Sequence, residues 1–391
     1  MSIIKRGQKG LIYYDGTKIS KGYNLFTPSL EKNCWLMDME GNFVHRWRLP
    51  YPPGLHSVLL PNGNLFYAAR VKEAEELGCG WGHEFSGLGG RFYELDWDSN
   101  IVWQQEAPYQ THDFAVLDNG NIVYMAWEPK GILSSEFASK VKGGLPGSEL
   151  NGAIWGDMLV EIDRNGNRVW EWLSYEHMDP EIDSICPLES RVQWLCLNSI
   201  YICQDKNILL SMRYPSEVVK IQHPTGSVLG RYGRGKIFHQ HDARELDNRN
   251  ILVFDNGTHR HEYQPEYSRV VELDPMKDEI VWEYKADTPS DFFTACCGGN
   301  ERQPNGNTLI IETEQGRMFE VTSTCEIVWE YVYPNYTYWH DRLMNHIWRL
   351  HRYPCNYDGL KGKDLDPDRF SWVNQVYGTN ACVKDIKPCI F

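Results

Sequence analysis

The sequence predicts an all-β protein, a six-bladed β-propeller of four-stranded antiparallel blades in a single domain. Three observations lead to this prediction. A phrase resembling Val-Trp-Glu-Tyr recurs at intervals of 47 to 67 residues, a turn of the Asn-Gly type recurs with it, and Val, Ile, Trp and Tyr are frequent between the turns. A repeat of this size and composition is typical of small antiparallel sheets in a radial array.

The first repeated phrase occurs six times, and each copy follows a short acidic or turn-rich link. We interpret each copy as one strand of a separate blade, so six copies predict six blades. The copies begin and end at Val44–Trp47, Val102–Trp103, Val169–Trp172, Val228–Tyr232, Val281–Tyr284 and Val328–Tyr331.

The second repeated phrase is a turn followed by an apolar strand. Asn and Gly both accept the positive φ that a tight hairpin turn needs, so each copy predicts a hairpin. Together with the first phrase, this gives four strands to each blade. The copies are Pro61–Asn64, Asp118–Asn121, Asp247–Asn250, Pro304–Asn307 and, more loosely, Gln204–Asn207.

The repeats also set the expected domain organisation. Residues 23–333 should form the propeller, residues 1–22 should pack on the ring, and residues 334–391 should form a C-terminal extension on its rim.

Composition excludes several classes of function. The net charge of −14, from 53 acidic and 39 basic residues, disfavours nucleic acid as a partner because phosphate contacts need a basic surface. The sequence contains no run of 18 apolar residues, so it predicts no membrane span. The first residues lack the apolar core of a signal peptide. The eleven cysteines contain no Cys-x-x-Cys pair, which is typical of reduced thiols. We therefore expect a cytoplasmic protein, with homo-oligomer formation left open.

Candidate catalytic residues emerge from one position of the repeat. The residue nine places before the last Asn of each turn should lie on the strand that lines the propeller channel. His56 lies one residue from the same position. A repeat that carried only structural information would place Val or Ile here, so His112, His241 and His56 are candidates for catalysis. The five residues at this position are Leu55, His112, Asn198, His241 and Gly298.

Two local phrases add further candidates. The first runs from His239 through His241 to Arg244, and is followed by Val253–Gly257 and then Arg260. The second joins Leu195–Ile200, which contains Asn198, to a Ser-Met-Arg-Tyr-Pro-Ser segment around Arg213.

Those phrases resemble the arylsulfate sulfotransferase family over residues 23–333, most strongly over 194–284. The resemblance implies that His241 takes the sulfuryl group and Arg213 binds sulfate, with a phenol as acceptor, a sulfohistidine intermediate and no cofactor. The family has a third His two residues before Asn-Ser-Ile, where this chain has Cys196. A thiol is only a weak hydrogen-bond donor, so this position departs from the family's chemistry.

The residue types suit that reaction. A neutral imidazole is a good nucleophile near pH 7, and the planar fork of an Arg matches the oxygens of a sulfuryl group. The 22 Tyr and 15 Trp residues can build a pocket for a small aromatic substrate. We assign catalysis to His241, His112, Arg213 and His56, and substrate binding to residues beside them: Cys196, Asn198, Arg260 and His239.

Two other functions fit the same residues. His56, His112 and His241, with Cys196 nearby, could hold a transition metal in a lyase or hydrolase. The chain could also be a non-catalytic propeller scaffold that binds partners through its surface loops.

Overall fold

The computed structural model describes residues 9–71, 88–261, 265–339 and 342–376. The protein is all-β, with a propeller arrangement of four blades rather than the predicted six. The chain divides into two compact units built from separate segments. Unit 1 comprises Met1–Val71, Arg91–Gln104 and Ala286–Phe391, and unit 2 comprises Lys72–Gly90 and Gln105–Lys285.

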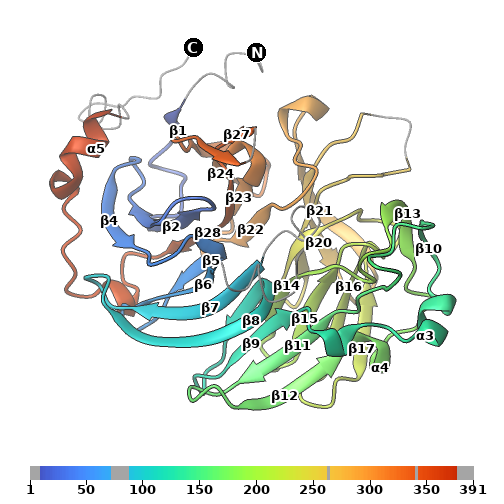
Figure 1. The fold of residues 1–391 in the computed structure, drawn as a ribbon. Coiled ribbons are helices and arrows are strands. Elements are labelled where there is room, and N and C mark those ends of the chain that lie inside the picture. Colours follow the sequence, from blue (N-terminus) through green and yellow to red (C-terminus); the bar gives the residue numbers. More distant parts are fainter. Residues whose placement is uncertain (1–8, 72–87, 262–264, 340–341, 377–391) are drawn as a thin grey trace. The chain divides into compact units, whose positions relative to one another are not determined.

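Unit 1 contains two of the four blades, and both ends of the chain contribute strands to them. In one blade, β28 pairs antiparallel with β2 (Figure 1), so the C-terminal region supplies a strand that the sequence had not indicated. In the other, β1 adds a fifth strand against β25. In sheet order, the strands are β28 (Ile347–Tyr353), β2 (Tyr23–Pro28), β3 (Asn33–Met37) and β4 (Phe43–Arg48), then β1 (Gly10–Tyr14), β25 (Ile327–Val332), β24 (Arg317–Val321), β23 (Thr308–Glu312) and β22 (Gly299–Arg302).

Unit 2 contains the other two blades, each with its strands in chain order. Two smaller segments pair beside them as β10 (Gly143–Leu145) and β13 (Ile185–Ser190). The blade strands are β14 (Leu197–Ile202), β15 (Ile208–Met212), β16 (Glu217–Ile221) and β17 (Val228–Tyr232), then β18 (His241–Glu245), β19 (Ile251–Asp255), β20 (Arg269–Asp274) and β21 (Glu279–Lys285).

The prediction of six separate blades was wrong because two repeats share one strand. The segment from the Val102–Trp103 phrase to His112 contains no Gly or Asn-Gly turn, and it forms the single strand β8, 16 residues long. The remaining strands therefore belong to one seven-stranded sheet instead of two blades. Its order is β12 (Arg168–Leu173), β11 (Met158–Ile162), β9 (Ile122–Ala126), β8 (Ile101–Val116), β7 (Leu88–Leu95), β6 (Leu65–Arg70) and β5 (Pro53–Leu59).

The predicted strands and turns are confirmed. All six copies of the first phrase lie on strands, and every copy of the second phrase joins two strands. Each turn places its third residue at positive φ, including Lys206 at 65° and Arg249 at 70°, where the other turns have glycine. The flanking Asn side chains and backbone bonds therefore hold the turn geometry even without glycine.

The short remaining elements and the cores complete each unit. In unit 2, apolar residues of β9 and β11 pack against those of β15 and β16, with Trp172 and Trp194 fully buried among them. Among the described residues, no helix has the length and apolar character needed to cross a bilayer. In the part of the chain that the structure describes, the α-helices are α3 (Ser135–Lys140), α4 (Ser174–His177) and α5 (Ser371–Val376), and a further strand pair is β26 (Thr337–Trp339) with β27 (Arg342–Met344).

The repeated position that holds His112 and His241 coincides with irregularities in strand pairing. The pairing register shifts between Thr111 and Phe114, and again between His241 and Arg244. A bulge leaves one residue unpaired and re-aims the side chains around it, which is why bulges are frequent next to active sites.

Candidate active site

His241 begins β18 and is held by an amide from the neighbouring strand's end. Its Nδ1 lies 2.7 Å from Oδ1 of Asn256, and the imidazole is buried, with 1% of the residue exposed. An amide oxygen only accepts hydrogen bonds, so this contact favours the tautomer with the proton on Nδ1 and the lone pair on Nε2. This tautomer is the one that a nucleophilic Nε2 requires.

Asn256 is fixed in turn by its surroundings. The preceding residue, Asp255, is completely buried and accepts hydrogen bonds from the guanidinium groups of Arg260 (3.0 Å) and Arg269 (2.7 Å). Arg260 also stacks over the ring of Tyr267, with 4.5 Å between the guanidinium carbon and the ring centroid. The guanidinium of Arg260 thus stabilises the end of β19, which lies next to His241. The expected role of Arg260 in substrate binding stays a prediction.

Arg213 follows β15 and forms an ion pair with a carboxylate that the sequence did not indicate. Its Nη1 lies 2.7 Å from Oε1 of Glu189, and the same oxygen is 3.1 Å from Nδ1 of His239. Burial raises the pKa of Glu189, but His239 and Arg213 outweigh it and lower the pKa to about 2. Glu189 is therefore ionised near neutral pH and offsets part of the positive charge of Arg213.

The backbone of Cys196 is held by a buried carboxylate and contacts Arg213, while its role in substrate binding stays a prediction. The backbone N–H groups of Leu195, Cys196 and Leu197 all donate to the buried carboxylate of Asp157, at 2.9 to 3.2 Å. Cys196 itself has a φ of 53°, and its carbonyl accepts from the backbone N–H of Arg213 at 3.2 Å. Asp157 thereby fixes the segment that leads from Cys196 into β14.

The same network reaches His112 and Asn198. The ring of His112 packs edge-on against Trp127, with 5.2 Å between centroids, and its Nδ1 lies 2.9 Å from the hydroxyl of Thr111. Trp127 donates to Asp157 at 3.5 Å. Asn198 donates to the carbonyl of Gln240, the residue between His239 and His241, at 2.8 Å. Hydrogen bonds, ring contacts and chain neighbours therefore link all the candidates of unit 2 into one network.

His56 belongs to unit 1, whereas the residues of the network above belong to unit 2. It is buried in β5, and its ring is 5.8 Å from that of His351, centroid to centroid. Its participation in catalysis stays a prediction.

The alternative reading from the sequence, in which His56, His112 and His241 hold a metal, stays a prediction. Two groups of three donors lie within 4.8 Å of one another among the described residues, and neither contains His56, His112 or His241. The first comprises Cys186, His239 and His259, and the second comprises Cys203, Asp205 and Glu245.

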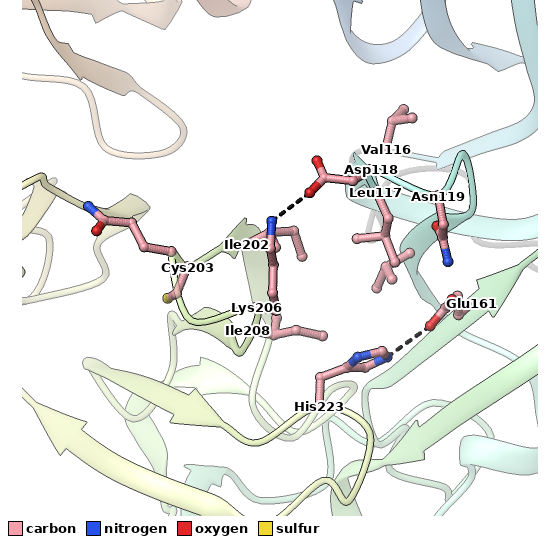
Figure 2. A pocket seen from close by; sticks show the side chains of 12 residues that line it. Val116, Leu117, Asp118, Asn119, Glu161, Ile202, Cys203, Lys206, Ile208 and His223 are labelled. Atoms are coloured by element: carbon pink, nitrogen blue, oxygen red, sulfur yellow. Dashed lines mark hydrogen bonds and ion pairs between the residues drawn. The ribbon is translucent and has the colours of Figure 1, made fainter.

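A cavity of about 480 Å³ lies elsewhere in unit 2, at the turn ends of β8 and β14. Figure 2 shows its two ion pairs, Lys206 with Asp118 at 2.5 Å and His223 with Glu161 at 2.8 Å. None of the residues predicted for catalysis or substrate binding lines it. Its charged side chains form ion pairs with one another.

Sequence reasoning missed several residues of this network. Asn256 stands in the Phe-Asp-Asn-Gly phrase, so that phrase was the available signal. Cys186 and Glu189 belong to no motif, and Asp157 acts through backbone groups far away in the sequence, so no local pattern could have indicated them.

Solved structures similar to this chain share little of its sequence, and no curated protein matches it. A protein of unknown function from Bacteroides caccae has 14% identity and a TM-score of 0.49, covering 80% of this chain and 94% of that one. A streptogramin B lyase has 11% identity and a TM-score of 0.45, covering 89% and 94%, and a virginiamycin B lyase variant from Staphylococcus aureus has 10% and 0.44, covering 83% and 87%.

The family comparison covers most of the chain. The model of the arylsulfotransferase (ASST) family matches residues 56–334, a range that includes every residue predicted for catalysis or substrate binding. The chain therefore belongs to the arylsulfotransferase family.

Proposed function

We propose that this chain moves a sulfuryl group from an aryl sulfate to a phenolic acceptor through a sulfohistidine at His241. Family membership supports a transferase. The observation that carries the residue assignment is the hydrogen bond between Nδ1 of His241 and Oδ1 of Asn256, which directs the lone pair to Nε2.

In the first half-reaction, the lone pair of Nε2 attacks the sulfur of the aryl sulfate. The N–S bond forms while the bond from sulfur to the aryl oxygen breaks, and the aryl oxide leaves with its electron pair and takes a proton from solvent. The proton on Nδ1 stays in place, because the oxygen of Asn256 accepts its hydrogen bond throughout. The amide dipole also stabilises the positive charge that develops on the ring.

In the second half-reaction, the oxygen of the acceptor phenol attacks the same sulfur. The N–S bond breaks, its electron pair returns to Nε2, and the phenolic proton leaves through a pocket imidazole to solvent. No oxidant or reductant is needed, and the donor's phenol can leave before the acceptor binds. Two half-reactions of this kind predict ping-pong kinetics.

Arg213 and His112 are assigned to the oxygens of the transferring group. Charge is spread over those oxygens in the transition state, and an Arg fork can bind two of them at once. One nitrogen of Arg213 is paired with Glu189. That carboxylate both orients the guanidinium and lowers the net positive charge, so we expect weaker binding of sulfate than a lone Arg would give.

The proposal is tested by following nitrophenol release from 4-nitrophenyl sulfate with a second phenol present. Wild-type protein should release nitrophenol in proportion to the acceptor, and His241→Asn should abolish release while circular dichroism stays unchanged. His177→Asn is the matched control, since His177 stacks on Trp172 at 5.5 Å and should leave the rate unaltered. Full activity in His241→Asn would contradict the proposal.

A further inference from the structure

Three donor side chains converge beside the proposed active site, and two of them, Cys186 and His259, have no other proposed role. Cys186 comes from β13, His239 precedes β18, and His259 follows β19. We call these three residues the Cys186 cluster. Their donor atoms all lie within 4.8 Å of one another, and Sγ of Cys186 is 3.5 Å from Nδ1 of His259.

These separations suit a single metal ion. Zinc binds a thiolate at about 2.3 Å and an imidazole nitrogen at about 2.0–2.1 Å, so tetrahedral angles place the sulfur and nitrogen about 3.6 Å apart. The contact between Cys186 and His259 already has nearly this length. Small side-chain rotations would bring His239 to the same distance.

The burial of His239 is a second observation that points to a ligand. Only 1% of this residue is exposed, and Nε2 makes no hydrogen bond with the residues that the structure describes, while Nδ1 faces Glu189 at 3.1 Å. A buried polar atom without a hydrogen bond is costly, and a metal ion would satisfy Nε2.

The neighbouring carboxylate has the position of an outer ligand. Oε1 of Glu189 lies 3.1 Å from Nδ1 of His239 and 3.9 Å from Nδ1 of His259. Metal-binding histidines usually direct their second nitrogen to a carboxylate, which orients the ring. Glu189 can orient His239 in this way while Arg213 holds the carboxylate from the other side.

We propose that Cys186, His239 and His259 bind one divalent transition metal of the zinc class, with Nε2 of His239 as its donor. Three protein ligands leave the fourth tetrahedral position open, as in catalytic zinc sites. A thiolate and two neutral imidazoles leave a single net positive charge on the occupied site. The metal would therefore add positive charge beside Arg213, where an anionic substrate is expected.

The second donor group is a weaker candidate for the same ion. Nζ of Lys220 lies 2.9 Å from both Asp205 and Glu245, so an ammonium already neutralises those carboxylates. Burial raises the pKa of Cys203 to about 12, which opposes formation of its thiolate. We therefore use Cys203 as the control cysteine.

The experiment uses the full chain, stripped with a chelator and then equilibrated with Zn²⁺ or Co²⁺ alone. We expect one equivalent of Zn²⁺ after desalting. With Co²⁺, we expect visible absorption of a tetrahedral site and a near-ultraviolet band from thiolate-to-cobalt charge transfer. Cys186→Ser should remove the charge-transfer band, and His259→Gln should weaken Zn²⁺ binding at least about tenfold. Cys203→Ser should change neither result.

Three outcomes would overturn the proposal. They are the absence of stoichiometric binding in wild-type protein, binding that survives both Cys186→Ser and His259→Gln, and binding that only Cys203→Ser removes. His239→Gln serves as a further ligand variant. Circular dichroism of each variant separates loss of the metal site from loss of the fold. The measurement needs no aryl sulfate, so its result is independent of sulfuryl transfer.

Discussion

Nδ1 of His241 and Oδ1 of Asn256 lie 2.7 Å apart, although 15 residues separate them in the chain. This contact makes Asn256 a positioning residue for the nucleophile. Asn256→Ala should lower kcat on the order of 100-fold with a smaller effect on KM, because the ring loses its fixed tautomer.

A second variant distinguishes positioning from a purely structural role of Asn256. A carboxylate in Asn256→Asp would stabilise the protonated ring of His241, so the acid limb of the kcat/KM profile should move to higher pH. An Asn256→Asp profile with an unchanged acid limb would contradict the assignment.

Arg213 should depend on the shape of its side chain as well as on its charge. Arg213→Lys keeps the charge and can still pair with Glu189, but a point charge cannot bind two sulfuryl oxygens at once. We expect a loss of kcat/KM for aryl sulfates of about tenfold or more. Arg168→Lys is the matched control, because Arg168 also pairs with carboxylates but lies on β12, outside the proposed site. The Arg168→Lys protein should keep the wild-type activity. Equal effects of the two substitutions would refute the role of Arg213.

Asp157 should be essential for stability, because both of its carboxylate oxygens accept hydrogen bonds from the backbone. Oδ2 accepts from Leu195 and Cys196, while Oδ1 accepts from Leu197. The Asp157→Asn substitution turns one of these oxygens into an amide donor that faces other donors. It should lower the free energy of unfolding by about 3 kcal/mol, nearly as much as Asp157→Ala.

Urea denaturation measures this loss. Asp118→Asn, at an exposed ion pair, is the control and should cost less than about 1 kcal/mol. A similarly small cost at Asp157 would show that its three backbone contacts are weak.

The lowered pKa of His45 in unit 1 predicts how the free energy of unfolding depends on pH. Burial, above all, lowers its pKa to about 3, and Arg369, Lys363 and Arg46 add to the effect. The unfolded chain takes up this proton below about pH 6.5. The native state does not, so stability should fall as the pH drops from about 6.5 towards 3.

The contribution of His45 can be isolated by substitution. Protonation of the unfolded chain at pH 5 should cost about 2 kcal/mol relative to neutral pH. His45→Phe keeps the stacking on Trp97, whose centroid is 3.8 Å away, and should remove that part of the pH dependence in urea denaturation between acidic and neutral pH. An unchanged pH dependence in the variant would mean that His45 is protonated in the native state.

Local patterns in the sequence predicted the strands and turns. Each Asn-Gly-type turn and each Val-Trp phrase lies where the repeat placed it, since hairpins and alternating strands depend on nearby residues. The number of blades was wrong because β8 continues through a segment where a break was expected. The strand β28 was missed because its pairing with β2 joins two segments from opposite ends of the chain.

The site shows the same limit. His241 and Arg213 could be proposed because they stand in recognisable phrases. Glu189, which pairs with Arg213, and Asp157, which holds the backbone around Cys196, depend on contacts between distant segments. A sequence pattern contains no information on such contacts, so the electrostatics of Arg213 could be derived only from the structure.

Mass spectrometry of the intermediate tests the central claim most directly. Wild-type protein is mixed with 4-nitrophenyl sulfate without an acceptor, quenched at alkaline pH and digested. We predict one SO₃ group on the peptide that contains His241, its loss when a phenol is added before the quench, and its absence in His241→Asn. A wild-type protein that turns over the sulfate while carrying SO₃ on another residue, or on none, would contradict the account.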